Sequence, residues 1–338
     1  MKLSLRLALA LAVTALLVSL PSFSVEDRHV EYPTYSAHAN GISIAYQDFD
    51  VADGVAEKGT ILLVMGLGAQ LVNWNDDLVL ALADEGYRVI RFDNRDAGWS
   101  EKFYDAPTPG LFTGIRFKLG WSLSSPYKLD DMAADAIGLV DALGIDKVHV
   151  VGASMGGMIA QIMAARYPDR VATLTSIMST TGAAHLPLGT VDLNMSSDAK
   201  SRQELIDGTY KLVTQFGGRA ANLEYDATFK RLARYYDRSH YAPGGARQFW
   251  AILDSGDRVE LLKTVKQPTL VMHGDADALV PASGGEHTAE VVEGSKYVVL
   301  KGMGHHIDEV ALPTIIKEIL EVAALAPTSK LTNKGKPW

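Results

Sequence analysis

The sequence predicts an α/β fold in which a mostly parallel sheet carries helices on both faces and an inserted helical cap. Two observations lead to this fold: short, almost wholly apolar runs alternate with longer amphipathic runs, and the alternation stops between residues 181 and 265. Strands that are apolar along their whole length are typical of parallel sheets buried under helices. With 338 residues, 47% of them apolar and 21% charged, the chain is long enough to bury a large core.

Seven short runs are predicted strands because each is largely apolar and rich in β-branched or aromatic residues. In chain order they are Ile42–Tyr46, Thr60–Met65, Tyr87–Phe92, Lys147–Val151, Ala172–Ile177, Thr269–Met272 and Tyr297–Leu300. Two helices are predicted between them by apolar residues at helical spacing, Leu129–Leu143 and Met155–Arg166.

The segment between residues 181 and 265 is predicted to be a cap inserted into the core. It is polar, and Ser201–Phe216, Leu223–Arg238 and Gly245–Leu253 have helical patterns. A structureless loop of this length would be unusual inside a compact domain, whereas an insertion after a strand is accommodated at the surface. The core is therefore expected in two parts, residues 25–180 and 266–326, followed by a disordered tail over residues 327–338.

The first 24 residues are expected to be a secretory signal peptide. Lys2 and Arg6 give it a positive start, an apolar run follows from Leu7 to Leu20, and small residues allow cleavage after Ser24. This apolar run is short for a membrane span, so an uncleaved anchor is the less favoured alternative. We expect an exported, periplasmic or extracellular protein without stable membrane association after cleavage.

Composition argues against several classes of partner and cofactor. The net charge is −8 with acidic and basic residues interspersed, which leaves no basic face for nucleic acid. The chain has no cysteine and therefore no disulfide, and its nine histidines form no metal-binding motif. Gly66 and Gly68 are not followed by the third glycine of a dinucleotide-binding fingerprint. No metal and no cofactor are expected.

Residues 152–156 have the sequence Gly-Ala-Ser-Met-Gly, a G-x-S-x-G motif between a predicted strand and a predicted helix. A turn that leads directly from strand to helix leaves its middle residue strained, with the side chain exposed above the end of the sheet. Ser154 is therefore the predicted nucleophile. The alternative is a tight turn of small residues without chemistry.

A serine nucleophile requires a histidine base and a carboxylate that orients the base. Two aspartates compete for the acid, and Asp277 is favoured over Asp275 because it stands four residues before Pro281, in a loop that begins at the end of a predicted strand. Two histidines compete for the base, and His305 is favoured over His306 because a glycine-rich approach delivers it first. Spacing alone does not show which way these side chains point.

Acyl transfer also requires hydrogen-bond donors for the developing oxyanion. We expect them to be the backbone N–H groups of Leu67, in a glycine-containing loop after a strand, and of Met155, directly after the nucleophile. The charged loop Asp93–Ser100 is interpreted as a brace for the Leu67 segment, with its charges paired to one another.

Aromatic residues are frequent in and near the predicted cap, and most of them should pack its helices together. The others are expected to line an apolar pocket over the nucleophile, which suits a small-molecule ester with an apolar acyl or alcohol part. The candidates for this pocket are Trp74, Trp121, Phe249 and Trp250.

With these residues in place, the chain resembles the α/β-hydrolase fold superfamily from about residue 38 to residue 325. Residues 64–68, 92–100, 246–248, 255–258 and 302–305 are similar to the branch that contains aclacinomycin methylesterase and many carboxylesterases. This resemblance implies a triad of Ser154, Asp277 and His305 with oxyanion donors at Leu67 and Met155. Where many relatives have a His-Gly pair, this chain has Met65-Gly66, which leaves a backbone donor intact.

The sequence therefore predicts a secreted serine hydrolase that cleaves carboxylic esters through an acyl-enzyme on Ser154. One alternative keeps the triad but transfers the acyl group to peroxide, as in cofactor-free perhydrolases and haloperoxidase-like enzymes. A second alternative is a non-catalytic binding protein on the same fold.

Overall fold

The computed structural model describes residues 31–110, 116, 119, 121–187, 189–191, 201–326 and 328. The predicted signal peptide, residues 1–24, lies outside this part of the chain, as does the predicted tail except for residue 328. The chain divides into two units, residues 1–33 and 34–338, and every described helix and strand belongs to the second unit.

The second unit is built on an eight-stranded sheet with the order β1-β2-β4-β3-β5-β6-β7-β8. β1 and β2 pair antiparallel, as do β2 and β4, and all other neighbours are parallel, so the predicted fold class is confirmed. The strands are β1 Tyr35–Ala39, β2 Ile42–Phe49, β3 Gly59–Val64, β4 Tyr87–Phe92, β5 Val148–Ala153, β6 Val171–Ile177, β7 Thr269–Gly274 and β8 Lys296–Leu300.

The register aligns the carboxyl ends of the central strands at one edge of the sheet. Val64 at the end of β3 pairs with Phe92 at the end of β4 and with Gly152 in β5. On the other side, Ala153 pairs with Ile177, the last residue of β6. The loops that follow these strands therefore leave the sheet side by side, which is where open α/β sheets place their ligands.

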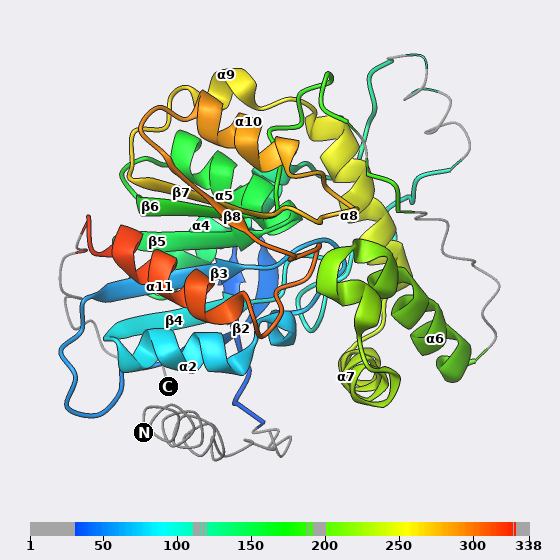
Figure 1. The fold of residues 1–338 in the computed structure, drawn as a ribbon, viewed down its shortest axis with the longest axis horizontal. Helices are drawn as coiled ribbons and strands as arrows, with labels where there is room; N and C mark the ends of the chain where they lie inside the picture. Colours follow the sequence, from blue (N-terminus) through cyan, green and yellow to red (C-terminus); the bar gives the residue numbers. More distant parts are fainter. Residues whose placement is uncertain are drawn as a thin grey trace, which may run out of the picture. The chain divides into compact units, whose positions relative to one another are not determined.

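Helices cover both faces of the sheet. α2 (Asp76–Asp84) and α11 (Leu312–Ala323) contact each other on one face. α4 (Leu129–Ala142) and α5 (Met155–Arg166) contact each other on the opposite face, together with α10 (Ser283–Val291) (Figure 1). Helix α5 is buried on almost all sides because the sheet and its neighbouring helices enclose it.

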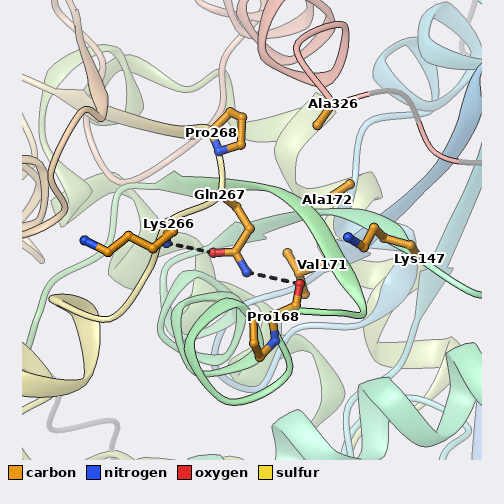
Figure 2. A pocket seen from close by; sticks show the side chains of 8 residues that line it. All are labelled: Lys147, Pro168, Val171, Ala172, Lys266, Gln267, Pro268 and Ala326. Atoms are coloured by element: carbon orange, nitrogen blue, oxygen red, sulfur yellow. Dashed lines mark hydrogen bonds between the residues drawn. The ribbon is translucent and has the colours of Figure 1, made fainter.

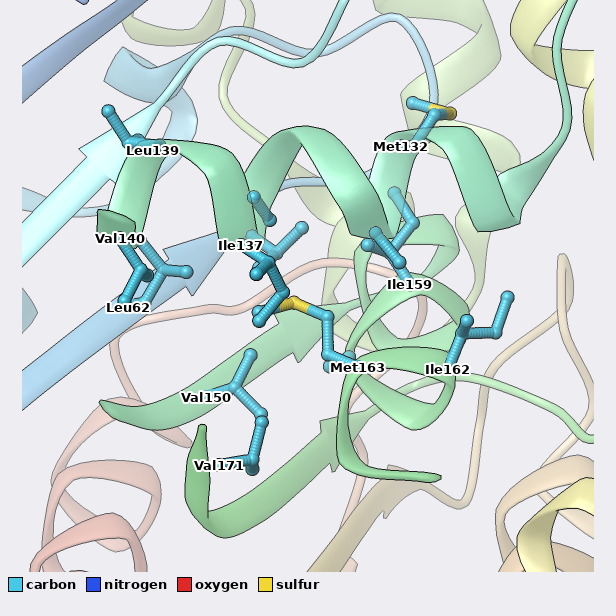
Figure 3. Close-up of a cluster of buried hydrophobic side chains, with 14 of the residues drawn as sticks. Leu62, Met132, Ile137, Leu139, Val140, Val150, Ile159, Ile162, Met163 and Val171 are labelled. Carbon is cyan, nitrogen blue, oxygen red and sulfur yellow. The ribbon is translucent and has the colours of Figure 1, made fainter. Parts of the chain in front are cut away.

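The main apolar cluster of the core lies between α4, α5 and the central strands (Figure 3). Side chains of both helices, such as Ile137 and Met163, meet Leu62 of β3 and Val150 of β5 in this layer. Because α5 begins directly after Ser154, the packing of this cluster fixes the position at which the Ser154 backbone leaves the sheet.

The described residues of the polar segment between β6 and β7 form several helices from residue 202 to residue 262. Figure 1 shows α6, α7 and α8 beside the carboxyl ends of the strands, whereas α9 contacts α5 and α10. Leu262 and Val265 belong to the main apolar cluster, so the C-terminal end of this segment packs with the core. The elements are α6 Arg202–Val213, η2 Thr214–Phe216, η3 Gly218–Asn222, α7 Tyr225–Arg238, α8 Ala242–Ser255 and α9 Val259–Leu262. In the described part of the chain, no helix combines the length and the hydropathy needed to span a membrane.

A buried histidine in β5 determines part of the pH dependence of stability. His149 is 1% exposed, with its Nδ1 3.0 Å from Thr173 Oγ1. Burial lowers the pKa of His149 from 6.5 to about 4. Between these two pH values the unfolded chain binds a proton that the folded chain lacks, so the free energy of unfolding falls as the pH is lowered through this range.

Between pH 7 and pH 5 the free energy of unfolding should fall by about 2 kcal/mol less in His149→Gln than in wild-type protein, because glutamine does not titrate. Urea unfolding at both pH values measures this difference. His38→Gln, at an exposed position of β1, is the matched control and should keep the wild-type pH dependence. A His149→Gln variant with an unchanged pH dependence would contradict the expectation.

Candidate active site

Ser154 occupies a strained turn between β5 and α5. Its φ is 56° and its ψ is −121°, a backbone conformation that residues with side chains rarely adopt. Two glycines make this turn possible: a Cβ on Gly152 would overlap the carbonyl of Gly156, and a Cβ on Gly156 would overlap the carbonyl of Val64. The G-x-S-x-G spacing thus reflects close backbone packing, and it leaves the serine side chain half-exposed at the sheet edge.

Three predicted site residues form one chain of hydrogen bonds. Ser154 Oγ lies 2.9 Å from His305 Nε2, and His305 Nδ1 lies 2.7 Å from Asp277 Oδ2. They come from three loops, after β5, β7 and β8, which the parallel sheet brings to one edge. The carboxylate accepts from Nδ1–H, which leaves Nε2 free to accept the serine proton.

Asp277 is held in its ionised form by the groups around it. Burial alone would raise the pKa of this carboxyl, but hydrogen bonds from His273 and His305 lower it below its usual range. Its Oδ1 also accepts from the backbone N–H groups of Leu279 and Val280, each at 2.9 Å. A fixed carboxylate of this kind orients a histidine and stabilises its charged form.

The competing aspartate, Asp275, bonds to the loop before His305 instead of to the imidazole. Asp275 accepts from Gly302 N–H at 2.6 Å and pairs with Lys301 at 3.1 Å near the surface. Burial and nearby Arg231 lower the pKa of His306 to about 4. Asp275 therefore supports the loop that precedes His305.

The Leu67 loop approaches the nucleophile closely. A Cβ on Gly66 would lie 3.2 Å from Ser154 Cβ, so the peptide that carries the Leu67 N–H passes beside the serine. Met155 is the first residue of α5, where the backbone N–H has no partner within the helix. Both predicted oxyanion donors therefore belong to backbone next to Ser154, and their catalytic role stays a prediction.

The Asp93–Ser100 loop braces the Leu67 segment, but its charges do not pair with one another. Asn94 Nδ2 donates to the Met65 carbonyl at 2.8 Å. Asp93 pairs with Arg238 of α7 at 2.9 Å, and Asp96 binds Arg247 of α8 through two bonds of 2.8 and 2.9 Å. Neighbouring residues in a turn point in different directions, so these carboxylates reach other elements, including two helices of the inserted segment.

A short turn of the inserted segment contacts both the acid and the base loops. The Phe216 carbonyl accepts from His305 N–H at 2.9 Å and from Ala278 N–H at 3.2 Å. The Phe216 ring meets the His305 imidazole edge to face, with 5.7 Å between the ring centroids. Arg219 N–H adds a bond to the Gly302 carbonyl at 3.2 Å. The inserted segment thus helps to hold the loops that carry Asp277 and His305.

The four predicted pocket residues lie in different environments. Trp74 is buried, and its indole N–H has no hydrogen-bond partner in the described part of the chain. Trp121 is exposed beside residues that the structure does not describe. Phe249 and Trp250 follow each other in α8, the first exposed and the second buried. Contact of any of them with a substrate stays a prediction.

A hollow of about 310 Å³ lies at the other end of the sheet, and Figure 2 shows the side chains that line it. It lies where β5, β6 and β7 begin, whereas Ser154 follows the end of β5. None of the predicted site residues lines this hollow. Its lining residues are Lys147, Pro168, Val171, Ala172, Lys266, Gln267, Pro268 and Ala326. Within the residues that the structure describes, no group of three or more His, Asp or Glu side chains is arranged to hold a metal ion.

Two side chains at the site were not singled out by the sequence. His273 Nε2 lies 3.3 Å from Asp277 Oδ2 and 2.9 Å from the Val280 carbonyl, so it contacts both the Asp277 carboxylate and the backbone of the same loop. Gln248 of α8 bonds to the Leu67 loop. A histidine four residues before an acid is a detectable signal, whereas Gln248 is visible in the sequence only as part of the stretch 246–248 that resembles the carboxylesterase branch.

Comparison with known families places this geometry among hydrolases. The sequence matches the family described as alpha/beta hydrolase fold over residues 59–310. Rhodomycin D methylesterase of Streptomyces peucetius is 26% identical over 310 residues, covering 80% of this chain and 91% of that protein. A 2-hydroxy-6-oxononadienedioate/2-hydroxy-6-oxononatrienedioate hydrolase of Pseudomonas putida is 30% identical over 227 residues, 62% of this chain and 77% of that protein.

Solved structures with the same fold include a meta-cleavage product hydrolase from Pseudomonas fluorescens. It superimposes with a TM-score of 0.67 at 22% identity, covering 86% of this chain and 97% of that one. An esterase from a Rhodococcus species superimposes with a TM-score of 0.65 at 19% identity, covering 86% and 98%. At these identities the superpositions establish the fold.

Proposed function

Because this chain belongs to the α/β-hydrolase fold family, we propose that it cleaves carboxylic esters through an acyl-enzyme on Ser154. The observation that carries this proposal is the continuous hydrogen-bond chain from Ser154 Oγ through His305 to Asp277, at 2.9 and 2.7 Å. The likeness to the Streptomyces methylesterase, which spans 80% of this chain, supports an ester as substrate.

The first half of the reaction forms the acyl-enzyme. His305 Nε2 takes the proton of Ser154 Oγ, and the serine oxygen attacks the ester carbonyl. The backbone N–H groups of Leu67 and Met155 stabilise the oxyanion, while Asp277 stabilises the imidazolium. The tetrahedral intermediate collapses, and His305 gives its proton to the leaving alcohol.

The second half releases the acid. A water molecule takes the place of the alcohol, His305 removes its proton, and the resulting hydroxide attacks the acyl carbonyl. Collapse of this second tetrahedral intermediate breaks the bond to Ser154 and returns the proton to Oγ. Exposed apolar side chains at Leu67 and Phe249 support an apolar part in the substrate. The charged start and apolar run of residues 1–24 support export.

Two other reactions use the same three residues. Similarity to a bromoperoxidase from Mycobacterium tuberculosis, at 25% identity over 78% of this chain, supports acyl transfer to peroxide as the second candidate. The 30% identity with the Pseudomonas putida hydrolase supports a carbon–carbon bond as an alternative target. Peracid formation from acetate and peroxide, and turnover of a dienoate substrate, distinguish these reactions from ester hydrolysis.

We expect a fluorophosphonate probe to label the folded protein at Ser154, because the probe forms a stable adduct with an activated serine. Mass spectrometry of the proteolysed adduct locates the labelled residue. A panel of methyl esters, lactones and p-nitrophenyl esters of rising chain length should then show a preference for short to medium apolar acyl groups. Folded protein that the probe does not label would favour a binding function, and fastest turnover on long-chain triglyceride would contradict the acyl preference.

A further inference from the structure

A buried glutamine connects the inserted segment to the Leu67 loop. Gln248 lies in α8 and is 0% exposed. Its Oε1 accepts from Gly68 N–H at 2.7 Å, and its Nε2 donates to the Arg95 carbonyl at 2.7 Å. One end faces a donor and the other an acceptor, so the amide has a single favourable orientation.

The loop that Gln248 contacts has little support of its own. Leu67 and Gly68 are exposed, and Gly68 has a φ of +66°, which favours glycine. Behind this tip, Asn94 fixes the Met65 carbonyl at 2.8 Å, and Ala69 N–H bonds weakly to the Gly66 carbonyl at 3.3 Å. Gln248 therefore anchors the open side of the loop.

The hydrogen bonds of Asn94 and Gln248 lie on either side of the peptide that carries the proposed oxyanion donor. The Gly66 carbonyl and the Leu67 N–H belong to one planar peptide, so turning one turns the other. Asn94 holds the peptide before it and Gln248 the peptide after it. With both neighbours fixed, the Leu67 N–H keeps its direction beside Ser154.

Gln248 is itself held in place by rigid neighbours. Arg247, the preceding residue, is 1% exposed and binds the buried carboxylate of Asp96 through two bonds. The backbone of Arg95, whose carbonyl accepts from Gln248, is fixed by the bond between its guanidinium and Asp135 at 2.6 Å. The amide therefore reaches the Leu67 loop from a position set by buried ion pairs.

We propose that Gln248 is a positioning residue that sets the direction of the Leu67 N–H toward the oxyanion. The inference rests on the proposed ester hydrolysis, because it assigns Leu67 its role in that reaction. It makes the inserted segment part of the catalytic geometry.

The test compares Gln248→Met with Gln161→Met. Methionine keeps the length of glutamine but removes both hydrogen bonds. Removing an oxyanion donor costs about a hundred- to a thousandfold in rate. Loss of its support in Gln248→Met should lower kcat by about ten- to a hundredfold with KM within about threefold. A trifluoromethyl ketone, which forms a tetrahedral adduct, should lose affinity in parallel with kcat/KM.

Gln161 is the matched control because it is also a 0% exposed glutamine with two side-chain bonds, to Ser176 and Arg258 at 3.2 Å each. Gln161→Met should lower the thermal midpoint and leave kcat near the wild-type value. Hydrogen exchange followed by NMR should show faster exchange of the Gly68 amide in Gln248→Met alone.

Each outcome decides a separate question. If wild-type protein hydrolyses esters and Gln248→Met keeps its kcat within twofold, the positioning role is wrong. Equal losses of kcat in both variants would also overturn it, because they would indicate a general packing effect. If wild-type protein neither hydrolyses esters nor reacts with the fluorophosphonate, the proposed function is wrong, and so is the role of Gln248 in catalysis. The exchange of the Gly68 amide still shows, in that case, whether Gln248 holds the loop.

Discussion

Ser154→Ala is expected to lower kcat for a short p-nitrophenyl ester by about three orders of magnitude or more. The substitution removes the atom that forms the acyl-enzyme, so no intermediate accumulates and probe labelling is lost. The residual rate should reflect the oxyanion donors and substrate binding, which remain. Steady-state kinetics on purified protein, with the thermal midpoint measured alongside, check this result.

The fold should tolerate this change. The backbone of Ser154 holds the turn against the end of β6: its N–H donates to the Ile177 carbonyl at 2.9 Å and its carbonyl accepts from Ser179 Oγ at 2.9 Å. Ser36→Ala, in an exposed position of β1, controls for the loss of a hydroxyl and should keep full activity. Near wild-type turnover in Ser154→Ala would remove this serine from the mechanism.

The second large effect is expected from Asp277→Asn, which should lower kcat by about three to four orders of magnitude. An amide nitrogen in place of Oδ2 would face His305 Nδ1 and favour the tautomer with the proton on Nε2. His305 Nε2 lies 2.9 Å from Ser154 Oγ, and once it carries a proton it can no longer accept the serine proton. The loss should appear in kcat, while KM changes little, because the ester itself does not touch Asp277.

Asp275→Asn provides the matched control, two residues away in the same loop. Asparagine still accepts from Gly302 N–H, and the ion pair that it loses with Lys301 is near the surface and of small value. Its kcat should stay within about twofold of wild type. Should Asp275→Asn lose more activity than Asp277→Asn, the assignment of the acid would have to be reversed.

Most strands could be predicted because their signal is local. The central parallel strands β3, β5, β6 and β7 are buried along their whole length, which requires a short, largely apolar run that is visible in the sequence. β1 escaped prediction because it is an edge strand with mostly exposed side chains. α2, α10 and α11 were not predicted either; α2 and α10 are each only nine residues long, which leaves little room for a helical pattern.

The candidate site also has one part that a local sequence pattern predicts and another part that depends on contacts between distant segments. The motif around Ser154 occupies five consecutive residues, so its pattern is visible locally, although one of its glycines, Gly156, is required by the approach of the distant Val64 carbonyl. Asp275 and Asp277 both follow β7, and the sequence favoured one of them without showing where either side chain points. The hydrogen bond of 2.7 Å between Asp277 and His305 depends on how the β7 and β8 loops meet.

The sequence by itself determined the alternation of strands and helices, the strained turn at Ser154 and the family of the chain, because burial on two faces and backbone overlap leave marks within a few residues. The tertiary structure decided what lies against what: that Asp277 rather than Asp275 meets His305, that Phe216 joins the acid and base loops, and that Gln248 reaches Gly68. These contacts join segments up to 180 residues apart. A hydrogen bond at that separation depends on the packing of the whole sheet and its helices, and no short stretch of sequence encodes it.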